Sequence, residues 1–376
     1  MRKVLFVNGQ EVLLKQNDGG KKCSYSNYRI LQGAYGQENV YIRMYTNEFT
    51  GDEERVMREK SHKTIFHKII NVFLLRPFFS IKQEKELLNH ILANNYDMVF
   101  FERTMFGPIT KKLNKQGVKT GVFAENIEKE YVWNKVKKQN LFYLLPYVST
   151  KYNEKLMLKY VDSVVCLTKR DSDLLMKLYC RKSNAIIPIT FVDEYNSGNV
   201  QNKKSDTKTL MFIGSCFAPN YDGILWFVNN VMPFLQDYTL IIVGKGFEQK
   251  AETLSRTNVE VVGTVSDLSE YYSRDAVIVM PILYGNGIKI KTAEALMYGK
   301  NIFATDEALV GYEIDNIEGI YRCNSAEEFV DKINDFYNEK GKYNIAFNEK
   351  VRECFLDKYE HRRGVELFQD AFEVEG

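Results

Sequence analysis

The chain has 376 residues and a formal net charge of +2, with 45% hydrophobic and 27% charged residues. This balance is typical of a globular protein of two or three domains and excludes wholesale disorder and collagen-like or low-complexity chains. Six cysteines without a C-x-x-C pair exclude a disulfide scaffold and a thiolate zinc site, and four histidines without H-E-x-x-H or H-x-H spacing argue against a histidine metal centre.

The first apolar run, Val4–Val7, is four residues long, too short for the apolar region of a signal peptide. No run of 18 apolar residues follows that would span a bilayer. We therefore expect a cytoplasmic protein, either free or at the inner face of the plasma membrane. The composition, rich in Tyr, Asn, Lys and Ile, suggests a bacterial source.

Short β-rich runs alternate with helical patterns through the first half of the chain. The predicted strands are Val4–Val7, Val40–Tyr45, Met98–Phe101, Thr120–Ala124, Ser163–Leu167 and Ala185–Ile187. The predicted helices lie near 25–35, 82–94, 105–116, 150–161 and 171–179. Strands that are apolar throughout and separated by helices indicate a parallel sheet covered on both faces.

Residues 60–83 form the most basic segment, with five Lys or Arg and no Asp or Glu. Its large apolar residues recur at helical spacing, for example at Phe66, Ile69, Ile70 and Phe73. A basic amphipathic helix of this kind can lie in a membrane interface, so we predict peripheral contact with an anionic membrane. The alternative is a core-packing helix with a solvated basic edge. No stacking platform, helix-turn-helix or finger motif supports nucleic-acid binding.

A change of charge and a polar stretch, 193–208, both suggest a domain boundary near residue 200. Residues 1–200 hold 32 Lys and Arg against 21 Asp and Glu, a net of +11. Residues 201–376 hold 19 against 28, a net of −9. A basic first domain is steered toward anionic partners.

The second half repeats the alternation of the first. The predicted strands are Thr209–Ile213, Thr239–Val243, Val259–Val262, Ala276–Met280, Asn301–Ala304 and Gly319–Tyr321, with helices near 221–235, 247–255, 267–272, 290–298, 326–338 and 344–356. Two such blocks predict an α/β protein of two doubly wound, Rossmann-like domains facing across a cleft. Ligands of such sheets bind beyond the carboxyl ends of the strands, so we expect the site in this cleft.

The strand-to-helix segment from Gly285 to Gly299 has features of an anion site. Gly285 and Gly287 let backbone N–H groups approach an oxyanion, and the positive end of the following helix points to the same place. Lys289 and Lys291 stand at that end, where a helix disfavours cations unless an anion lies between them. Glu294, one turn on, can accept hydrogen bonds from two adjacent hydroxyls, as in a ribose. The alternative is an ordinary turn followed by an i,i+3 ion pair.

In combination, four motifs resemble the large retaining family of GT-B-fold glycosyltransferases, which includes sucrose synthases and many bacterial polysaccharide enzymes. The resemblance covers most of 205–375. Its motifs are F-I-G-S at 212–215 with P-N-Y-D-G at 219–223, D-L-x-x-Y from Asp267 to Tyr271, and G-x-G-I-K-x-K-x-x-E-A from 285 to 295.

The resemblance implies roles for residues of the second half. Glu294 would bind the ribose, while Lys289, Lys291 and the backbone near Gly287 would hold the diphosphate. Two loops would also bind the nucleotide. One carries Gly214 and Ser215, and the other, with Thr264 and Val265, would border the base. Many members have a glutamate eight residues before the ribose glutamate; here that position is Asn286, which we take as a candidate catalytic residue together with Lys289.

In the first half the resemblance is weaker. Gly19 and Gly20, after Asp18, match the family's glycine loop beside the donor phosphates, or else form a plain turn. The stretch from Ala124 to Tyr131 resembles an H-N-x-E-x-E-Y segment in which Glu125 replaces the histidine that usually faces the donor sugar. Glu125 is therefore a third candidate catalytic residue. The segment 168–171 resembles a loop on the acceptor side.

Asp171-Ser172-Asp173 spells the D-x-D metal motif of another glycosyltransferase fold. We interpret both acids as first-turn residues of the helix 171–179, where they complement the helix dipole. Two lysines and a helix end already supply positive charge, so no cofactor and no catalytic metal are expected.

The prediction is a hexosyl-type transferase that moves a sugar from a nucleoside diphosphate sugar to a saccharide or lipid-linked saccharide with retention, in cell-surface polysaccharide biosynthesis. The expected domains are an acceptor-side domain (1–200), a nucleotide-sugar domain (201–355) and a C-terminal helix (356–376) that returns to the first domain or caps the second. Two alternatives are a binding-only homologue acting as a scaffold and a GT-B-like sugar-nucleotide epimerase. The first is favoured by Asn286 and Glu125, and the second would require a richer set of acid and base groups.

Overall fold

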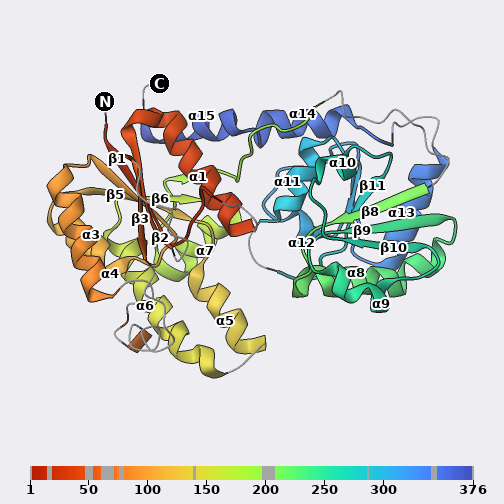
Figure 1. Ribbon diagram of the computed structural model, residues 1–376, viewed down its shortest axis with the longest axis horizontal. Coiled ribbons are helices and arrows are strands. Elements are labelled where there is room, and N and C mark those ends of the chain that lie inside the picture. Colours follow the sequence, from red (N-terminus) through yellow and green to blue (C-terminus); the bar gives the residue numbers. More distant parts are fainter. Residues whose placement is uncertain are drawn as a thin grey trace. The chain divides into compact units, whose positions relative to one another are not determined.

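The computed structural model describes residues 2–14, 19–46, 54–60, 72–73, 75, 80–138, 141–196, 208–285, 288–339 and 345–374. The chain divides into two compact units, Met1–Ile189 with His361–Gly376, and Thr190–Glu360 (Figure 1). The expected boundary near residue 200 falls within the second unit by this division, and the segment from His361 onward groups with the first unit.

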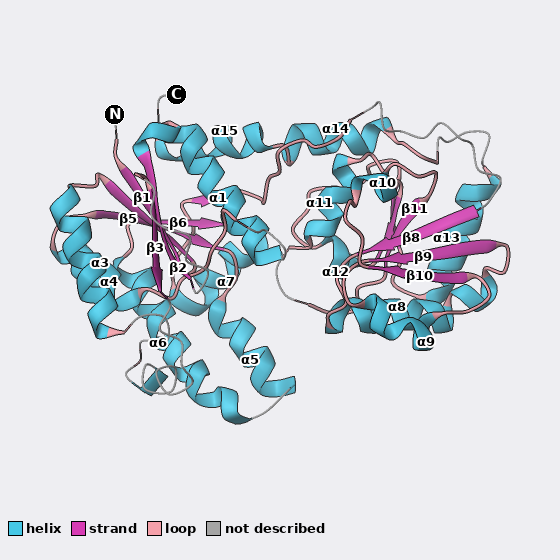
Figure 2. Cartoon of the chain, in the orientation of Figure 1, coloured by secondary structure: helices cyan, strands magenta, loops and turns pink. Residues whose placement is uncertain are grey.

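The first unit contains a seven-stranded, fully parallel sheet of order β3-β2-β1-β4-β5-β6-β7 (Figure 2). Its strands are β1 (Val4–Asn8), β2 (Val40–Thr46), β3 (Val56–Lys60), β4 (Met98–Glu102), β5 (Lys119–Ala124), β6 (Ser163–Cys166) and β7 (Ala185–Ile186). The sequence pattern missed β3, because only two of its five residues are apolar. Its Arg58 instead forms a buried ion pair with Glu11, with 2.9 Å between Nε and Oε2.

Helices cover both faces of this sheet. They are α1 (Gly19–Tyr35), α3 (Ile81–Asn94), α4 (Gly107–Lys115), α5 (Glu128–Lys138), α6 (Leu144–Tyr160), α7 (Lys169–Tyr179) and α15 (His361–Phe372), with short 3-10 turns η1 (Gln37–Asn39) and η2 (Leu141–Tyr143). Alternate residues of β1 enter two separate cores, Leu5 and Val7 on one face and Val4 and Phe6 on the other. Apolar strands of this kind are buried on both faces, as the sequence predicted.

The C-terminal helix α15 lies against α1. A Cβ at Gly33 of α1 would come within 2.5 Å of the Val365 side chain of α15, so this glycine permits the close approach. Phe368 of α15 is buried and packs on Phe100 and Phe123 of the sheet. The last helix is therefore part of the core of the first unit.

The basic segment 60–83 lies largely outside the described residues. Within it, the structure describes the end of β3, residues 72–73, 75 and 80, and the start of α3 at Ile81. The predicted membrane contact of this segment thus stays a prediction.

The second unit contains a six-stranded, fully parallel sheet of order β10-β9-β8-β11-β12-β13. Its strands are β8 (Lys208–Ile213), β9 (Tyr238–Val243), β10 (Val259–Gly263), β11 (Val277–Met280), β12 (Ile302–Ala304) and β13 (Ile320–Arg322). The surrounding helices are α8 (Ala218–Asn230), η4 (Met232–Phe234), η5 (Phe247–Lys250), α9 (Ala251–Leu254), α10 (Ser269–Tyr272), α11 (Ile290–Met297), α12 (Asp306–Leu309), α13 (Ala326–Asn338) and α14 (Glu349–Lys358).

In each sheet the strand order reverses once, at β1 and β4 in the first unit and at β8 and β11 in the second. Ligands of open parallel sheets bind at this reversal, beyond the carboxyl ends of the strands. Loops that follow these four strands are therefore the places to look for a site. Among the described residues, no helix has the length and apolar character needed to cross a membrane.

Candidate functional site

The second unit gathers most of the predicted site residues at the carboxyl edge of its sheet. Gly214 and Ser215 follow β8, Thr264 and Val265 follow β10, and Lys289 precedes α11 after β11. Lys291 and Glu294 lie in the first turn and a half of α11, which has no acidic residue in its first turn. The positive end of α11 thus meets two further cations, with no acidic residue in the first turn to balance them.

Lys291 is held by a residue far away in the sequence. Its ammonium donates a hydrogen bond to Oδ1 of Asn220, and Nδ2 of Asn220 donates to the carbonyl of Ser215 at 2.7 Å. The ammonium also lies 4.7 Å from the centre of the Phe212 ring. Burial, followed by repulsion from Lys289, lowers the pKa of Lys291 to about 7, although Glu294 opposes the change.

Lys289 forms an ion pair with Glu307 of α12, with 2.7 Å between Nζ and Oε1. Its backbone carbonyl accepts a hydrogen bond from the hydroxyl of Tyr312, at 2.7 Å. The Nζ atom also lies close to Gly285, where a Cβ would come within 3.4 Å of it. The ion pair with Glu307 and the hydrogen bond from Tyr312 fix Lys289 at the start of α11. A bound anion would have to compete with Glu307 for the Lys289 ammonium.

Glu294 projects from α11 toward α10. Its Oε2 accepts a hydrogen bond from the hydroxyl of Tyr272 at 3.4 Å. The Tyr272 ring stacks on Tyr298, with 4.8 Å between ring centres. Burial and the Glu294 carboxylate raise the pKa of Tyr272 well above its usual value, so this hydroxyl stays a donor at neutral pH.

Two glycines allow the strand-end loops to approach closely. Gly244 has φ +142°, and a Cβ there would lie 1.9 Å from the carbonyl oxygen of Gly214. A Cβ at Gly214 would in turn lie 3.0 Å from Asn220 Nδ2 and 3.3 Å from Lys291 Nζ. The side chain missing at Gly214 therefore leaves room for the Lys291 ammonium at the end of β8.

The loop after β10 is held by Glu248. Its carboxylate accepts from the hydroxyl of Thr264 at 3.2 Å and from the backbone N–H of Gly246 at 2.9 Å. Thr264 is exposed and Val265 half-buried, so their backbone groups border solvent beside the edge of the sheet. The remaining predicted residues of this unit, Asn286 and Gly287, lie outside the described residues.

In the first unit, Glu125 follows β5 and is 4% exposed. Both of its carboxylate oxygens are engaged: Oε2 accepts from Nε of Arg103 at 3.1 Å, and Oε1 accepts from the hydroxyl of Ser24 at 3.2 Å. Arg103 follows β4, has φ +71°, and keeps about a third of its side chain exposed. Arg103 is therefore the member of this pair that solvent reaches, whereas Glu125 is buried.

Three further buried carboxyl groups surround this ion pair. Burial is the main cause, and the charge of Glu125 the second, that raises the pKa of Glu102 well above its usual value. Burial raises the pKa of Glu128 to about 7 against the opposing effect of Arg103. Glu154, whose pKa burial also raises, accepts hydrogen bonds from Thr104 at 2.8 Å and from Tyr179 at 2.5 Å. The partly exposed Arg103 thus stands among four buried acids.

Gly19 and Gly20 form the first two positions of α1, whose later residues Ser24 and Asn27 reach Glu125 and Glu102. The glycines therefore begin a helix that faces the acid cluster. At the end of β1, the amide Nδ2 of Asn8 is buried and has no hydrogen-bond acceptor among the described residues. That amide is available as a donor at the reversal point of this sheet.

The D-x-D segment lies near the start of α7: Asp171 is in its first turn, as the sequence predicted, but Asp173 lies beyond it because the helix already begins at Lys169. Thr168 is the N-cap: its hydroxyl accepts from the backbone N–H of Asp171 at 3.0 Å and donates to the Asp171 carboxylate at 2.7 Å. Asp173 pairs with Lys169 on the surface, at 3.2 Å. Asp171 thus serves the helix end, whereas Asp173 forms a surface ion pair. Within the described ranges, no group of three or more His, Cys, Asp or Glu side chains is arranged to hold a metal ion.

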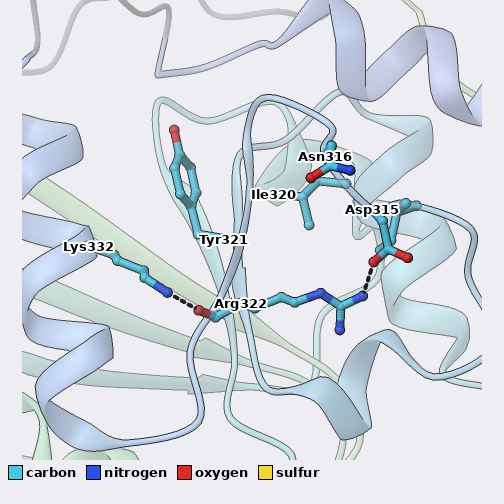
Figure 3. Close-up of a pocket in the computed structure, with 7 residues that line it drawn as sticks. Asp315, Asn316, Ile320, Tyr321, Arg322 and Lys332 are labelled. Carbon is cyan, nitrogen blue, oxygen red and sulfur yellow. Dashed lines mark hydrogen bonds and ion pairs between the residues drawn. The ribbon is translucent and has the colours of Figure 1, made fainter.

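A hollow of about 600 Å³ lies elsewhere in the second unit, beside β13 (Figure 3). Its cations are already engaged: Arg322 pairs with Asp315 at 2.5 Å and with Asp306 at 2.7 Å, while Lys332 donates to the carbonyl of Arg322 at 2.5 Å. None of the predicted site residues lines it. Its position at the sheet's outer strand also separates it from the reversal point, so we do not assign it to the site.

Sequence reasoning missed several residues that shape the two edges. Asn220 was part of a quoted motif, but nothing in the sequence pairs it with Lys291. Tyr272 ends the V-x-D-L-x-x-Y-Y segment, but nothing in the sequence pairs it with Glu294. Glu307 and Glu102 gave no signal, because each reaches its partner only through folding. Arg103 could have been noticed, since a charged pair, Glu102-Arg103, directly ends a buried strand.

Comparisons with known proteins agree with this geometry. Residues 207–339 match the family model described as "Glycosyl transferases group 1". This match lies within the second unit and covers less than half of the chain. The chain is also 23% identical over 288 residues to an "Uncharacterized 44.6 kDa protein in cps region" of Klebsiella pneumoniae, covering 71% of this chain and 72% of that protein.

Solved structures resemble the whole chain. The sucrose-phosphate synthase of Thermosynechococcus elongatus has a TM-score of 0.72 at 14% identity and matches 100% of both chains. Alr3699/HepE of Anabaena in complex with UDP has a TM-score of 0.68 at 11% identity, covering 99% of this chain and 100% of that one. At such identities the likeness shows the fold alone, and it confirms the predicted two-domain GT-B architecture.

Proposed function

We propose that this protein transfers a sugar from a nucleoside diphosphate sugar to a hydroxyl acceptor with retention of configuration, in the biosynthesis of a cell-surface polysaccharide. The main support is the arrangement at the start of α11, where Lys289, Lys291 and Glu294 lie at the carboxyl edge of a parallel sheet. The group 1 domain match over the same unit supports the proposal.

The donor nucleotide is assigned to this edge. Lys289, Lys291 and the N-terminal N–H groups of α11 would neutralise the diphosphate. Glu294 would accept hydrogen bonds from the ribose hydroxyls, with Tyr272 fixing its orientation. The exposed backbone at Thr264 and Val265 would border the base, and the loop with Gly214 and Ser215 would admit the phosphates next to Lys291. Gly287 keeps its predicted place beside the phosphates, and Asn286 stays a candidate catalytic residue.

The reaction breaks the bond between the anomeric carbon and the diphosphate oxygen, which keeps the electron pair. The acceptor oxygen bonds to the anomeric carbon on the same face and gives its proton to a phosphate oxygen. Negative charge builds up on the leaving diphosphate, and preorganised cations stabilise developing charge more than the ground state. Lys289 and Lys291 would therefore act mainly in the transition state.

In the first unit we assign the direct contact with substrate to Arg103 and a positioning role to Glu125. This refines the predicted catalytic role of Glu125, since its two oxygens are already occupied by Arg103 and Ser24. A guanidinium suits a phosphate or a sugar hydroxyl better than a buried carboxylate does.

Uridine diphosphate is the first nucleotide to test, because a structural neighbour was solved with UDP. A capsule-region relative supports a saccharide or lipid-linked saccharide as acceptor.

The deciding experiment is calorimetric titration with UDP, GDP, ADP, CMP and dTDP, each with and without Mg²⁺, followed by donor hydrolysis or transfer assays with the nucleotide that binds. We expect one nucleotide to bind without metal. Binding without any turnover, with any acceptor tried, would favour the scaffold. Conversion of the free donor to its epimer would favour the epimerase. Failure of every nucleotide to bind would contradict the proposed site.

A further inference from the structure

The helix α6 has an inverted distribution of polarity. Its buried residues are mostly polar: Ser149, Thr150, Asn153, Glu154, Met157 and Leu158. Its exposed residues include large apolar ones: Leu144, Leu145, Val148 and Tyr152. A surface helix of a globular protein normally shows the opposite arrangement. The exposed side chains of α6 therefore need an explanation other than packing within this unit.

The exposed apolar residues form one continuous face. Leu144, Val148 and Tyr152 follow each other at four-residue steps, which places them on one side of the helix. Phe142 of η2, 84% exposed, extends this face at its N-terminal end. We call the set Phe142, Leu144, Leu145, Val148 and Tyr152 the outer apolar face.

Lysines border the outer apolar face on the same helix. Lys151, Lys155 and Lys159 are exposed, and their three- and four-residue spacing from Val148 and Tyr152 continues the same side toward the C-terminal end. The segment 128–160 contains seven lysines and three acids, and two of these acids, Glu128 and Glu154, are buried. The surface around the outer apolar face is thus strongly positive.

The neighbouring helix α5 adds aromatic rings and more lysines. It packs against α6, and the rings of Trp133 and Tyr147 lie 4.9 Å apart. Tyr131 is exposed, with Nζ of Lys135 4.3 Å from its ring centre. Figure 1 shows α5 and the start of α6 extending away from the sheet of the first unit. Tyr and Trp beside lysines, at the edge of an apolar patch, are typical of membrane interfaces.

We propose that the outer apolar face and its lysines dock the first unit on an anionic phospholipid bilayer. The apolar side chains would enter the boundary between headgroups and acyl chains, and the lysines would pair with lipid phosphates. A second copy of this chain is a poorer occupant, because a symmetric dimer through this face would bring the same lysines together. The proposed surface shares no residue with the segment 60–83 and does not depend on the proposed transferase activity.

The test is vesicle flotation of the full chain, with vesicles of phosphatidylcholine alone or with about one quarter phosphatidylglycerol. We expect binding to the anionic vesicles only, and weaker binding at high salt because screening shortens the reach of the lysines. The variant Phe142→Glu with Val148→Glu should reduce the partition coefficient on the order of tenfold or more. Each of the single variants Lys151→Gln, Lys155→Gln and Lys159→Gln should reduce the partition coefficient about fivefold.

Phe234→Glu is the matched control, since Phe234 is 71% exposed but lies in the second unit. It should float as the unchanged protein does. Thermal unfolding and nucleotide binding of every variant report folding independently of lipid. The proposal is overturned if the unchanged protein ignores anionic vesicles, or if the Phe142→Glu, Val148→Glu variant binds them equally well. It is also overturned if that variant loses only a dimer seen by sedimentation, which would assign the face to self-association.

Discussion

The carboxyl edges of the two sheets have the same topology and opposite chemistry. In the first unit the edge holds Glu102, Glu125, Glu128 and Glu154 around Arg103. In the second unit it holds Lys289 and Lys291 at the positive end of α11. Each edge is opposite in sign to its half of the chain, since residues 1–200 carry +11 and residues 201–376 carry −9.

The net charge of each half of the chain therefore reflects its solvated surface and does not predict the charge at its binding edge. Lysines of the first half lie mainly on outer faces such as that of α6, while several of its acids gather where burial raises the pKa of Glu102 and Glu128. A parallel sheet fixes where a site lies, and the side chains at its strand ends decide what binds there. The following predictions test whether the two edges differ in function as they differ in charge.

The largest effect is expected from Lys289→Met. If the lysine stabilises charge on the leaving diphosphate, kcat should fall roughly 100- to 1,000-fold. Steady-state kinetics with the nucleotide sugar identified by calorimetry would measure this. Lys332→Met is the matched control, because Lys332 lies beside the hollow at β13, away from the site residues. Equal losses in both variants would contradict the assigned role.

A smaller loss is expected from Glu294→Ala. Removal of a charged acceptor of ribose hydrogen bonds should weaken nucleotide binding by about 1.5–3 kcal/mol, or about 10- to 150-fold. Isothermal titration would measure the change, with Glu353→Ala on the exposed side of α14 as control. Unchanged affinity would refute the ribose contact.

At the acidic edge, Arg103→Gln and Glu125→Gln should each lower kcat about 10- to 100-fold, and the double variant should lose little more than one of them. Two residues that act as a unit are strongly non-additive. A double-mutant cycle of kcat and KM would show this, and Arg103→Lys should restore part of the loss of Arg103→Gln. Additive losses would show that Glu125 and Arg103 act independently.

Glu128 should make folding stability depend on pH. Its pKa is about 7 in the folded protein, above the ordinary value of 4.5, so the folded state binds more protons between these values. The free energy of unfolding should therefore fall as pH rises from about 4.5 to 7. Glu128→Gln should remove part of this slope and raise stability at neutral pH by on the order of 1–2 kcal/mol. Urea unfolding at several pH values measures it, and an unchanged slope would contradict it.

The smallest effect is expected from Lys291. Its pKa is about 7 in the free protein, and a bound diphosphate should raise it, so binding above pH 7 should take up a proton. Nucleotide affinity should then fall as pH rises above 7, by no more than about tenfold per pH unit. Calorimetry in buffers of different ionisation enthalpy counts the proton. In Lys291→Met the uptake should vanish; if it persists there, another group titrates. Lys300→Met, at a second buried lysine whose pKa is also about 7, should leave the uptake unchanged.

The sequence predicted most of the fold because its signals are local. All the predicted strands formed, since apolar runs flanked by turn residues mark the buried strands of a parallel sheet. The pattern missed β3, where Arg58 and Glu59 interrupt the apolar run, and α5, whose lysines conceal the helix. The spacing that grouped Lys289, Lys291 and Glu294 was also readable, because Lys289 directly precedes the short helix that carries the other two.

Tertiary structure alone decided the partners of these residues. Asn220 meets Lys291 across 71 positions, and Ser24 meets Glu125 across 101, because strand order brings distant loops to one edge. It also turned the polar side of α6 inward, where Glu154 accepts four hydrogen bonds. Local patterns report which residues are buried, while charge pairing and pKa depend on neighbours that only the folded chain supplies.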